Sequence, residues 1–308
     1  MPAPPAPETD ASLASSARQR LVATLVMCAS TICFSLTDVL AKWLSAHYTV
    51  PQIVFCRGLF ALVPVMILAA HHGLIPSLAT RRPYAHMLRA VFAMLSLIAV
   101  FYAYSLMPLA DATAISFTTP LFVALMSAPF LAERVAVRTW IAVACGFIGV
   151  LIIVRPSWQS LGGSGWATPI ALVGAACSAA GAIVIREMSG TEKSVTVVFY
   201  QSLVVAACMA TTLPFLWIWP TSGDWMLLVA AGISGGTGQL LMTEAIRRAP
   251  AALVYPFDYL RVLWATVFGY AIFSDVPDLL LVVGTTIVIA SVLSMFERRP
   301  VPAGTRRG

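Results

Sequence analysis

Residues 105–117, SLMPLADATAISF, and residues 245–257, AIRRAPAALVYPF, decide the fold, because they align at a constant offset and each joins two long apolar runs. In both stretches one apolar run ends, the chain turns tightly and a second run begins. The run after the first turn closes with Phe130-Leu-Ala-Glu133, and the run after the second closes with Ala271-Ile-Phe-Ser-Asp275. The sequence therefore predicts two related halves.

The composition decides which solvent surrounds these halves. Of 308 residues, 59% are hydrophobic and 10% are charged, and the mean hydropathy is +0.88. A soluble globular protein carries about 25% charged residues, so a water-soluble enzyme and a disordered chain are both excluded. The apolar runs have helix length and do not alternate as barrel strands do. We predict an all-α integral membrane protein that lies in a lipid bilayer.

Ten runs approach the roughly 20 apolar residues that a transmembrane helix needs. They cover residues 21–44, 51–70, 84–107, 111–132, 139–154, 168–186, 195–217, 225–246, 251–273 and 279–296. Because five spans per half is an odd number, related halves must have opposite orientations in the membrane.

The domain organisation follows from these spans. We predict a flexible cytoplasmic tail over residues 1–20, a first five-helix repeat over 21–156, an inverted second repeat over 166–297 and a second cytoplasmic tail over 298–308. No basic region precedes an apolar core near Met1, so the first segment is not expected to be a cleavable signal.

The distribution of basic residues sets the orientation. The tails and every second connection hold Arg18, Arg20, Arg81, Arg82, Arg134, Arg138, Arg186, Lys193, Arg247, Arg248, Arg298, Arg299, Arg306 and Arg307, whereas the opposite connections hold Arg155. Since cytoplasmic loops are rich in Lys and Arg, both termini are predicted to be cytoplasmic. The net charge of +6 therefore reflects the basic residues of the predicted cytoplasmic loops. We expect no nucleic-acid partner.

Several motifs resemble a known superfamily. Ala112–Phe122 (ATAISFTTPLF), Phe130–Arg134 (FLAER), Gly146–Gly149 (GFIG) and Pro256–Arg261 (PFDYLR) are similar to segments of the drug/metabolite transporter superfamily, EamA type. Asp275 stands where that superfamily usually has Glu. The resemblance implies a ten-helix carrier of the cell inner membrane, with a central substrate cavity and alternating access.

A narrower resemblance concerns one branch of that superfamily. Asp38–Lys42 (DVLAK) and Pro83–Arg89 (PYAHMLR), together with the Ala112–Phe122 run, are most similar to the bacterial S-adenosylmethionine uptake branch. This similarity favours a small organic substrate such as an amino acid or an S-adenosylmethionine-like zwitterion or cation.

Charged residues inside the spans are candidates for function because an unpaired charge in the bilayer is costly. Asp38 and Arg57 are predicted to lie at similar depth on the first two spans, where they could form an ion pair that either locks the helices or handles ions. Asp38, Arg57 and Glu244 are our candidates for ion or proton coupling, although Glu244 also fits an interfacial position beside Arg247. Arg89 lies near a span end and is expected to snorkel to the interface.

The predicted substrate site lies near the middle of the ninth span. Asp258 and Arg261 share one helix face at i and i+3. They could bind the cationic and the carboxylate group of a zwitterion, or they could form a structural pair. The uncharged candidates for substrate binding are Tyr259, Tyr200, Gln201, Tyr104, Thr118 and Thr119.

Two other function classes were weighed. Gly232-Ile-Ser-Gly235 matches a GxSG motif of membrane-embedded serine enzymes, with Ser234 as the nucleophile, but the four histidines lie at or beyond span ends, and packing explains the glycines better. No filter motif supports a channel. The sequence contains no P-loop, HExxH or CxxC motif, so we expect no cofactor and no metal site. An ion gradient or substrate exchange would then drive transport.

Overall fold

The structure is a computed structural model that describes residues 10–71, 73–106, 115–133, 135–154, 166–273 and 279–296. All regular elements in these ranges are helices. The first half contains α1 (Asp10–Leu44), α2 (Val50–His71), α3 (Leu74–Leu78), α4 (Pro83–Leu106), α6 (Thr119–Leu131) and α7 (Val137–Val154). The second half contains α9 (Ala167–Met188), α10 (Ser194–Ala210), α11 (Leu213–Leu216), α12 (Ser222–Arg248), α13 (Ala251–Val254), the 3₁₀ turn η1 (Tyr255–Tyr259), α14 (Leu260–Phe273) and α15 (Leu279–Phe296).

The prediction of an all-α membrane protein is confirmed. Five helices of the described ranges are long and apolar enough to cross a bilayer, and shorter apolar helices accompany them. Within the described residues, each predicted apolar run overlaps with one helix or with consecutive short helices.

The structure differs from the predicted runs in two places. The first helix begins at Asp10, inside the segment predicted to be a flexible tail, because Ala, Leu, Gln and Arg are strong helix formers. The ninth run is divided into α13, η1 and α14. Pro256 lies within η1 and has no backbone N–H to donate to a preceding carbonyl, so an unbroken α-helix is disfavoured there.

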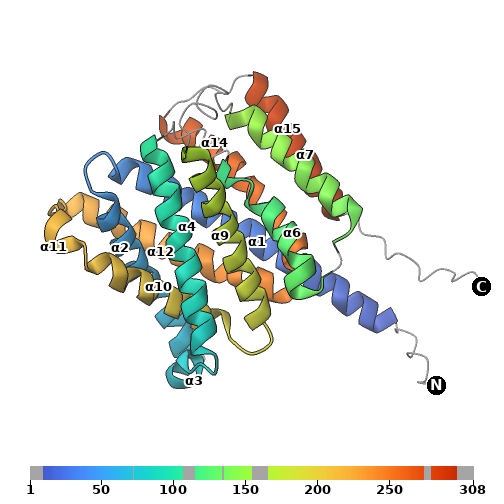
Figure 1. The fold of residues 1–308 in the computed structure, drawn as a ribbon, viewed down its shortest axis with the longest axis horizontal. Coiled ribbons are helices and arrows are strands. Elements are labelled where there is room, and N and C mark those ends of the chain that lie inside the picture. Colours follow the sequence, from blue (N-terminus) through green and yellow to red (C-terminus); the bar gives the residue numbers. More distant parts are fainter. Residues whose placement is uncertain are drawn as a thin grey trace, which may run out of the picture.

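The main helix contacts join the two halves of the chain (Figure 1). The helix α1 packs against α12 and α14, and α9 packs against α4 and α6. Each helix has a counterpart at the same place in the other half: α1 corresponds to α9, α4 to α12 and α6 to α14. Replacing each helix by its counterpart converts the contacts of α1 into those of α9. The contacts of α2 with α12 and of α4 with α10 are related in the same way, whereas the pairs α2–α10 and α7–α15 are their own counterparts. The two halves therefore interlock and are not separate bundles.

Glycines allow the closest of these approaches. A Cβ atom added at Gly236 of α12 would lie 2.7 Å from the backbone of Ala61 on α2, and Gly232 contacts the same helix. Gly232 and Gly236 form a GxxxG motif, and the prediction that packing explains the glycines of this segment is thereby confirmed. Likewise, a Cβ atom at Gly284 of α15 would lie 2.7 Å from the carbonyl oxygen of Gly149 on α7. The latter two helices lie side by side at one end of the molecule in Figure 1.

Candidate functional site

The interruption of the ninth helix lies where both halves meet. The 3₁₀ turn η1 contacts α1, α6 and α7 of the first half as well as its own neighbours α13, α14 and α15. All five of its residues are buried. In membrane proteins a broken helix within the bilayer is tolerated where it is surrounded by protein or lines a cavity. Residues three apart share one face of a 3₁₀ turn, so Tyr255 and Asp258 lie on the same face.

Three charged side chains form the centre of the candidate site, which we call the ionic group: Asp38, Asp258 and Arg261. One guanidinium nitrogen of Arg261, Nη2, lies 2.5 Å from Oδ2 of Asp38 on α1. The other, Nη1, lies 3.6 Å from Oδ2 of Asp258. Asp258 is 8% exposed. One arginine thus connects the first helix of the chain to the broken ninth helix, with one more carboxylate than guanidinium in the group.

Further contacts hold this arginine in place. Its guanidinium carbon lies 5.3 Å from the centre of the Phe34 ring, within the range of a cation–π interaction. The Ser35 hydroxyl donates a hydrogen bond of 3.1 Å to the Arg261 carbonyl oxygen. These contacts come from α1, so α1 orients both ends of the residue. The predicted Asp258–Arg261 pair exists, and Arg261 is already occupied by two carboxylates.

The expected Asp38–Arg57 pair is not among the ion pairs of the described residues, because Asp38 binds Arg261 instead. The physical reason is the helix arrangement. The helix α12 packs against both α1 and α2, so the first two helices do not face each other as sequence neighbours were assumed to do. The Arg57 side chain lies against α12, with its Nε 3.0 Å from the position of a Cβ at Gly235. It still interacts electrostatically with Asp38 and Arg261.

Tyr259 points away from the ionic group. It is fully buried, and its hydroxyl donates a hydrogen bond of 3.3 Å to the Val143 carbonyl on α7. Its ring occupies the space beside Gly146, where an added Cβ would lie 2.6 Å from a ring carbon. This side chain anchors η1 to α7.

Thr118 and Thr119 have local partners in the turn before α6. Their hydroxyls donate to the carbonyls of Ile115, at 2.6 Å, and Ser116, at 2.7 Å. Both hydroxyls thus have a backbone carbonyl three residues earlier in the chain as their acceptor.

The remaining uncharged candidates lie on α4 and α10. The Tyr200 hydroxyl donates to the Leu78 carbonyl at 3.2 Å, and its ring centre lies 4.9 Å from that of His86. Gln201 has a buried side-chain oxygen without a hydrogen-bond partner. Tyr104 is on α4, and its side chain lies outside the described residues. The structure therefore does not bring Tyr200 to the ionic group.

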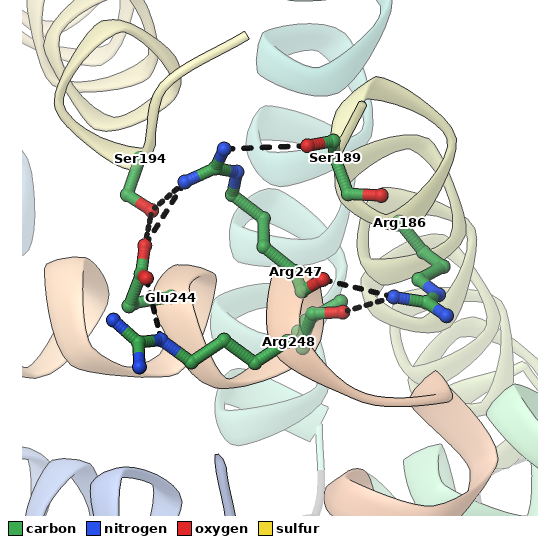
Figure 2. A network of polar contacts seen from close by, with 7 residues as sticks. Arg186, Ser189, Ser194, Glu244, Arg247 and Arg248 are labelled. Carbon is green, nitrogen blue, oxygen red and sulfur yellow. Dashed lines mark hydrogen bonds and ion pairs between the residues drawn. The ribbon is translucent and has the colours of Figure 1, made fainter. Parts of the chain in front are cut away.

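Glu244 belongs to a second polar cluster at the end of α12 (Figure 2). Its carboxylate accepts hydrogen bonds from Ser194 at 2.5 Å, from Arg247 at 3.0 Å and from Arg248 at 2.6 Å. Figure 2 shows Arg247 reaching Ser189 as well, whose carbonyl oxygen lies 3.2 Å away. Because both arginines neutralise this carboxylate at a helix C-terminus, the interfacial position fits Glu244 better than a position in the ionic group.

Arg186 joins the same end of the molecule to α6. Its guanidinium lies 2.8 Å from the Glu133 carboxylate and donates to the last carbonyls of α12, those of Ile246 at 3.2 Å and Arg247 at 3.0 Å. Glu133 thus anchors the end of α6 to α9. Asp275, which closes the ninth run, lies outside the described residues.

At the opposite end of α12, its first turn contacts Tyr48, which lies between α1 and α2. Its hydroxyl donates a hydrogen bond of 2.7 Å to the Asp224 carboxylate, and this bond raises the pKa of Tyr48. The phenol therefore remains a donor at neutral pH. Thr221 caps the helix by accepting a hydrogen bond from the Asp224 backbone N–H at 3.2 Å.

The sequence reasoning missed two buried polar features, the Arg89 side chain and the contact of His86 with Glu192. Arg89 was expected to snorkel, but it is 6% exposed and its Nη1 atom lies 2.8 Å from the position of a Cβ at Gly181 on α9. His86 lies 3.4 Å from Glu192, with both side chains buried. The position of Arg89 in the sequence could have indicated its burial. It lies six residues, or about 9 Å, beyond the start of α4.

A model of the EamA-like transporter family matches residues 21–155 and, a second time, residues 165–296. The chain belongs to the EamA-like transporter family. The predicted superfamily resemblance is thereby confirmed, and the double match shows the two-repeat membrane fold of that family.

Characterised relatives cover nearly the whole chain. An S-adenosylmethionine uptake transporter of Rickettsia bellii is 27% identical over 86% of this chain and 89% of its own length. A pseudopaline exporter of Pseudomonas aeruginosa is 30% identical over 85% and 91%. A riboflavin transporter of Rhizobium johnstonii is 29% identical over 94% and 97%.

The fold itself also has a solved counterpart. A crystal structure described only as "Crystal structure of protein" superposes with a TM-score of 0.75 at 19% identity, over 88% of this chain and 95% of the other. At this identity the similarity concerns the fold alone.

Family membership bears on the alternative reading of Ser234. This residue of α12 donates its hydroxyl hydrogen to the Cys33 carbonyl on α1 at 2.7 Å. The hydroxyl thus strengthens a helix contact, which agrees with a transporter family. In the described ranges no group of His, Cys, Asp and Glu side chains is arranged to hold a metal ion.

Proposed function

We propose that this protein is a secondary carrier for a small organic metabolite with a positive charge, such as an amino acid or an S-adenosylmethionine-like zwitterion. One observation carries the proposal: the ionic group lies at a broken helix where both halves meet, and its Asp258 carboxylate is buried there, 3.6 Å from Arg261. Substrate sites of carriers lie at such repeat interfaces. The Asp258 carboxylate suits a cationic group of the substrate.

The relatives support the substrate class and leave the direction of transport open. Their names include uptake of S-adenosylmethionine and export of pseudopaline, so import and export both occur among similar chains. Alternating access by rocking of interlocked bundles fits the exchange symmetry of the helix contacts. Because the sequence lacks a P-loop, we propose an ion gradient or substrate exchange as the driving force, with Asp38 and Asp258 as the coupling carboxylates.

In this proposal the carrier lies in the cell inner membrane and crosses it ten times. Its two halves have opposite orientations, and both termini lie in the cytoplasm. The asymmetric distribution of Lys and Arg supports this orientation.

The topology predicts which introduced cysteines an impermeant maleimide reaches from outside the cell. His47→Cys and Ser222→Cys should be labelled, whereas Ala136→Cys and Thr191→Cys should be labelled only after permeabilisation. All four positions are exposed. The unmodified protein, with its six cysteines inside apolar runs, is the control for background. Labelling of all four positions in intact cells would contradict the ten-span arrangement.

Transport itself is tested with purified protein in liposomes. A panel of S-adenosylmethionine, several amino acids and riboflavin is offered as labelled substrate, with the unlabelled compound preloaded inside. We expect saturable exchange of at least one zwitterion with a positive group, and none in protein-free liposomes. A folded, correctly inserted protein that exchanges no compound with a positive charge would refute the proposed function.

A further inference from the structure

Arg89 on α4 is a second buried cation, and its surroundings differ from those of Arg261. Its side chain is buried, and its Nε atom has no hydrogen-bond partner. Among the described residues no carboxylate forms an ion pair with it, whereas Arg261 has two. An unpaired cation in the interior of a membrane protein is costly, so such a residue normally has a partner or a function.

Two carboxylates, those of Glu192 and Glu133, already have partners. Glu192 lies beside His86 and accepts hydrogen bonds from the Thr80 hydroxyl and the Arg81 N–H. Glu133 binds Arg186. Neither of these carboxylates is therefore available to pair with Arg89.

The groups around Arg89 connect it to the ionic group. The guanidinium lies against α9 at Gly181, where the missing side chain leaves room for it. One turn earlier on α9, the Ser178 hydroxyl lies 3.4 Å from the Tyr255 hydroxyl. The Tyr255 phenol lies close enough to Arg89 and to Asp258 for both charges to act on its ionisation. Because Tyr255 and Asp258 lie one 3₁₀ turn apart, about 6 Å along the axis, a cation and a carboxylate flank the same short stretch of η1.

We propose that Arg89 binds a carboxylate of the transported substrate, while Asp258 binds the positive group of the same molecule. Arg261 was the sequence-based candidate for the carboxylate, but its guanidinium is occupied by Asp38 and Asp258. The inference rests on the proposed function and specifies its substrate class. The substrate would be a zwitterion whose carboxylate binds Arg89 and whose positive group binds Asp258. Tyr255 and Ser178 supply hydroxyls beside the bound carboxylate.

The decisive experiment uses the purified full-length protein and two probes, S-adenosylmethionine and its decarboxylated form. The wild type should bind the carboxylate-bearing probe at least about tenfold more tightly, since a hydrogen bond to a charged group is worth roughly 1.5–3 kcal/mol. In Arg89→Met this preference should vanish. Without ligand, Arg89→Met should melt at the same temperature as the wild type or higher, because an unpaired buried charge is removed.

A matched control separates a binding residue from a structural one. Arg186→Met removes an arginine that has a carboxylate partner and carbonyl partners, so it should lower the melting temperature and keep the preference for the carboxylate. If Arg89→Met fails to fold, Gly181→Ala replaces it. The added methyl group would lie 2.8 Å from Nη1 of Arg89. It would displace the guanidinium without removing its charge, so the preference for the carboxylate-bearing probe should again be lost.

The outcomes distinguish this inference from the proposed function. If Arg89→Met or Gly181→Ala keeps the preference, or if no carboxylate-bearing compound of the panel stabilises the wild type, the inference is overturned. If liposomes exchange riboflavin but no zwitterion, the protein is a transporter and the assignment of Arg89 is wrong. If a carboxylate-bearing probe binds through Arg89 but nothing is exchanged, Arg89 is an anion site and the carrier function fails.

Discussion

Arg261→Gln should abolish transport and strongly destabilise the protein, because it leaves Asp38 and Asp258 without the cation between them. Asp258 is buried and Asp38 is half exposed. Breaking a buried ion pair by removing one partner costs about 3–5 kcal/mol, and the exposure of Asp38 places our expectation at the lower end, about 3 kcal/mol. Thermal unfolding of the detergent-purified variant measures the loss.

A second substitution tests the origin of that loss. Arg261→Gln combined with Asp38→Asn should be more stable than Arg261→Gln alone, because fewer uncompensated carboxylates remain. The matched control is Arg82→Gln, since Arg82 lies 3.8 Å from Glu187 in an exposed pair and such pairs contribute little. Strictly additive losses in the double variant would show that Asp38 and Arg261 do not interact.

Asp258→Asn should strongly weaken transport while leaving the fold intact. The amide has nearly the size of the carboxylate, and Arg261 keeps Asp38 as its partner at 2.5 Å, so abundance and melting temperature should change little. The cationic group of the substrate loses its carboxylate, which should reduce the affinity by about 10- to 100-fold. Exchange in liposomes at several substrate concentrations measures this effect.

Glu187→Gln is the control for Asp258→Asn, because it removes a carboxylate of the same chain that is 66% exposed. Its transport should equal that of the wild type. Wild-type exchange in Asp258→Asn would identify the pair with Arg261 as purely structural.

The helical spans could be predicted from the sequence because they depend on local composition. Apolar runs of helix length give the positions of the helices, but they predicted one unbroken helix over residues 251–273, where the structure has α13, η1 and α14. The GxxxG motif with Gly232 and Gly236 predicts close packing, although it does not identify α2 as the neighbour.

Partners of buried charges could not be predicted, since they depend on helix order in space. Asp38 was expected beside Arg57 because their helices are consecutive, but α12 packs between these helices and α14 brings Arg261 to α1. For Arg89 the assumption of a snorkelling side chain failed, because Gly181 on α9 provides an interior position for the guanidinium. Both errors concern contacts between distant parts of the chain.

The contact between Asp38 and Arg261 also has a consequence for biosynthesis, because the two residues are 223 positions apart in the chain. At about 5–20 residues per second, a ribosome needs roughly 10–45 s to pass from one codon to the other. During this interval α1 is already available for insertion, and its carboxylate has not yet met its final partner. Chains released before α14 is made would lack Arg261, so the Asp38 carboxylate would have no guanidinium partner from that helix.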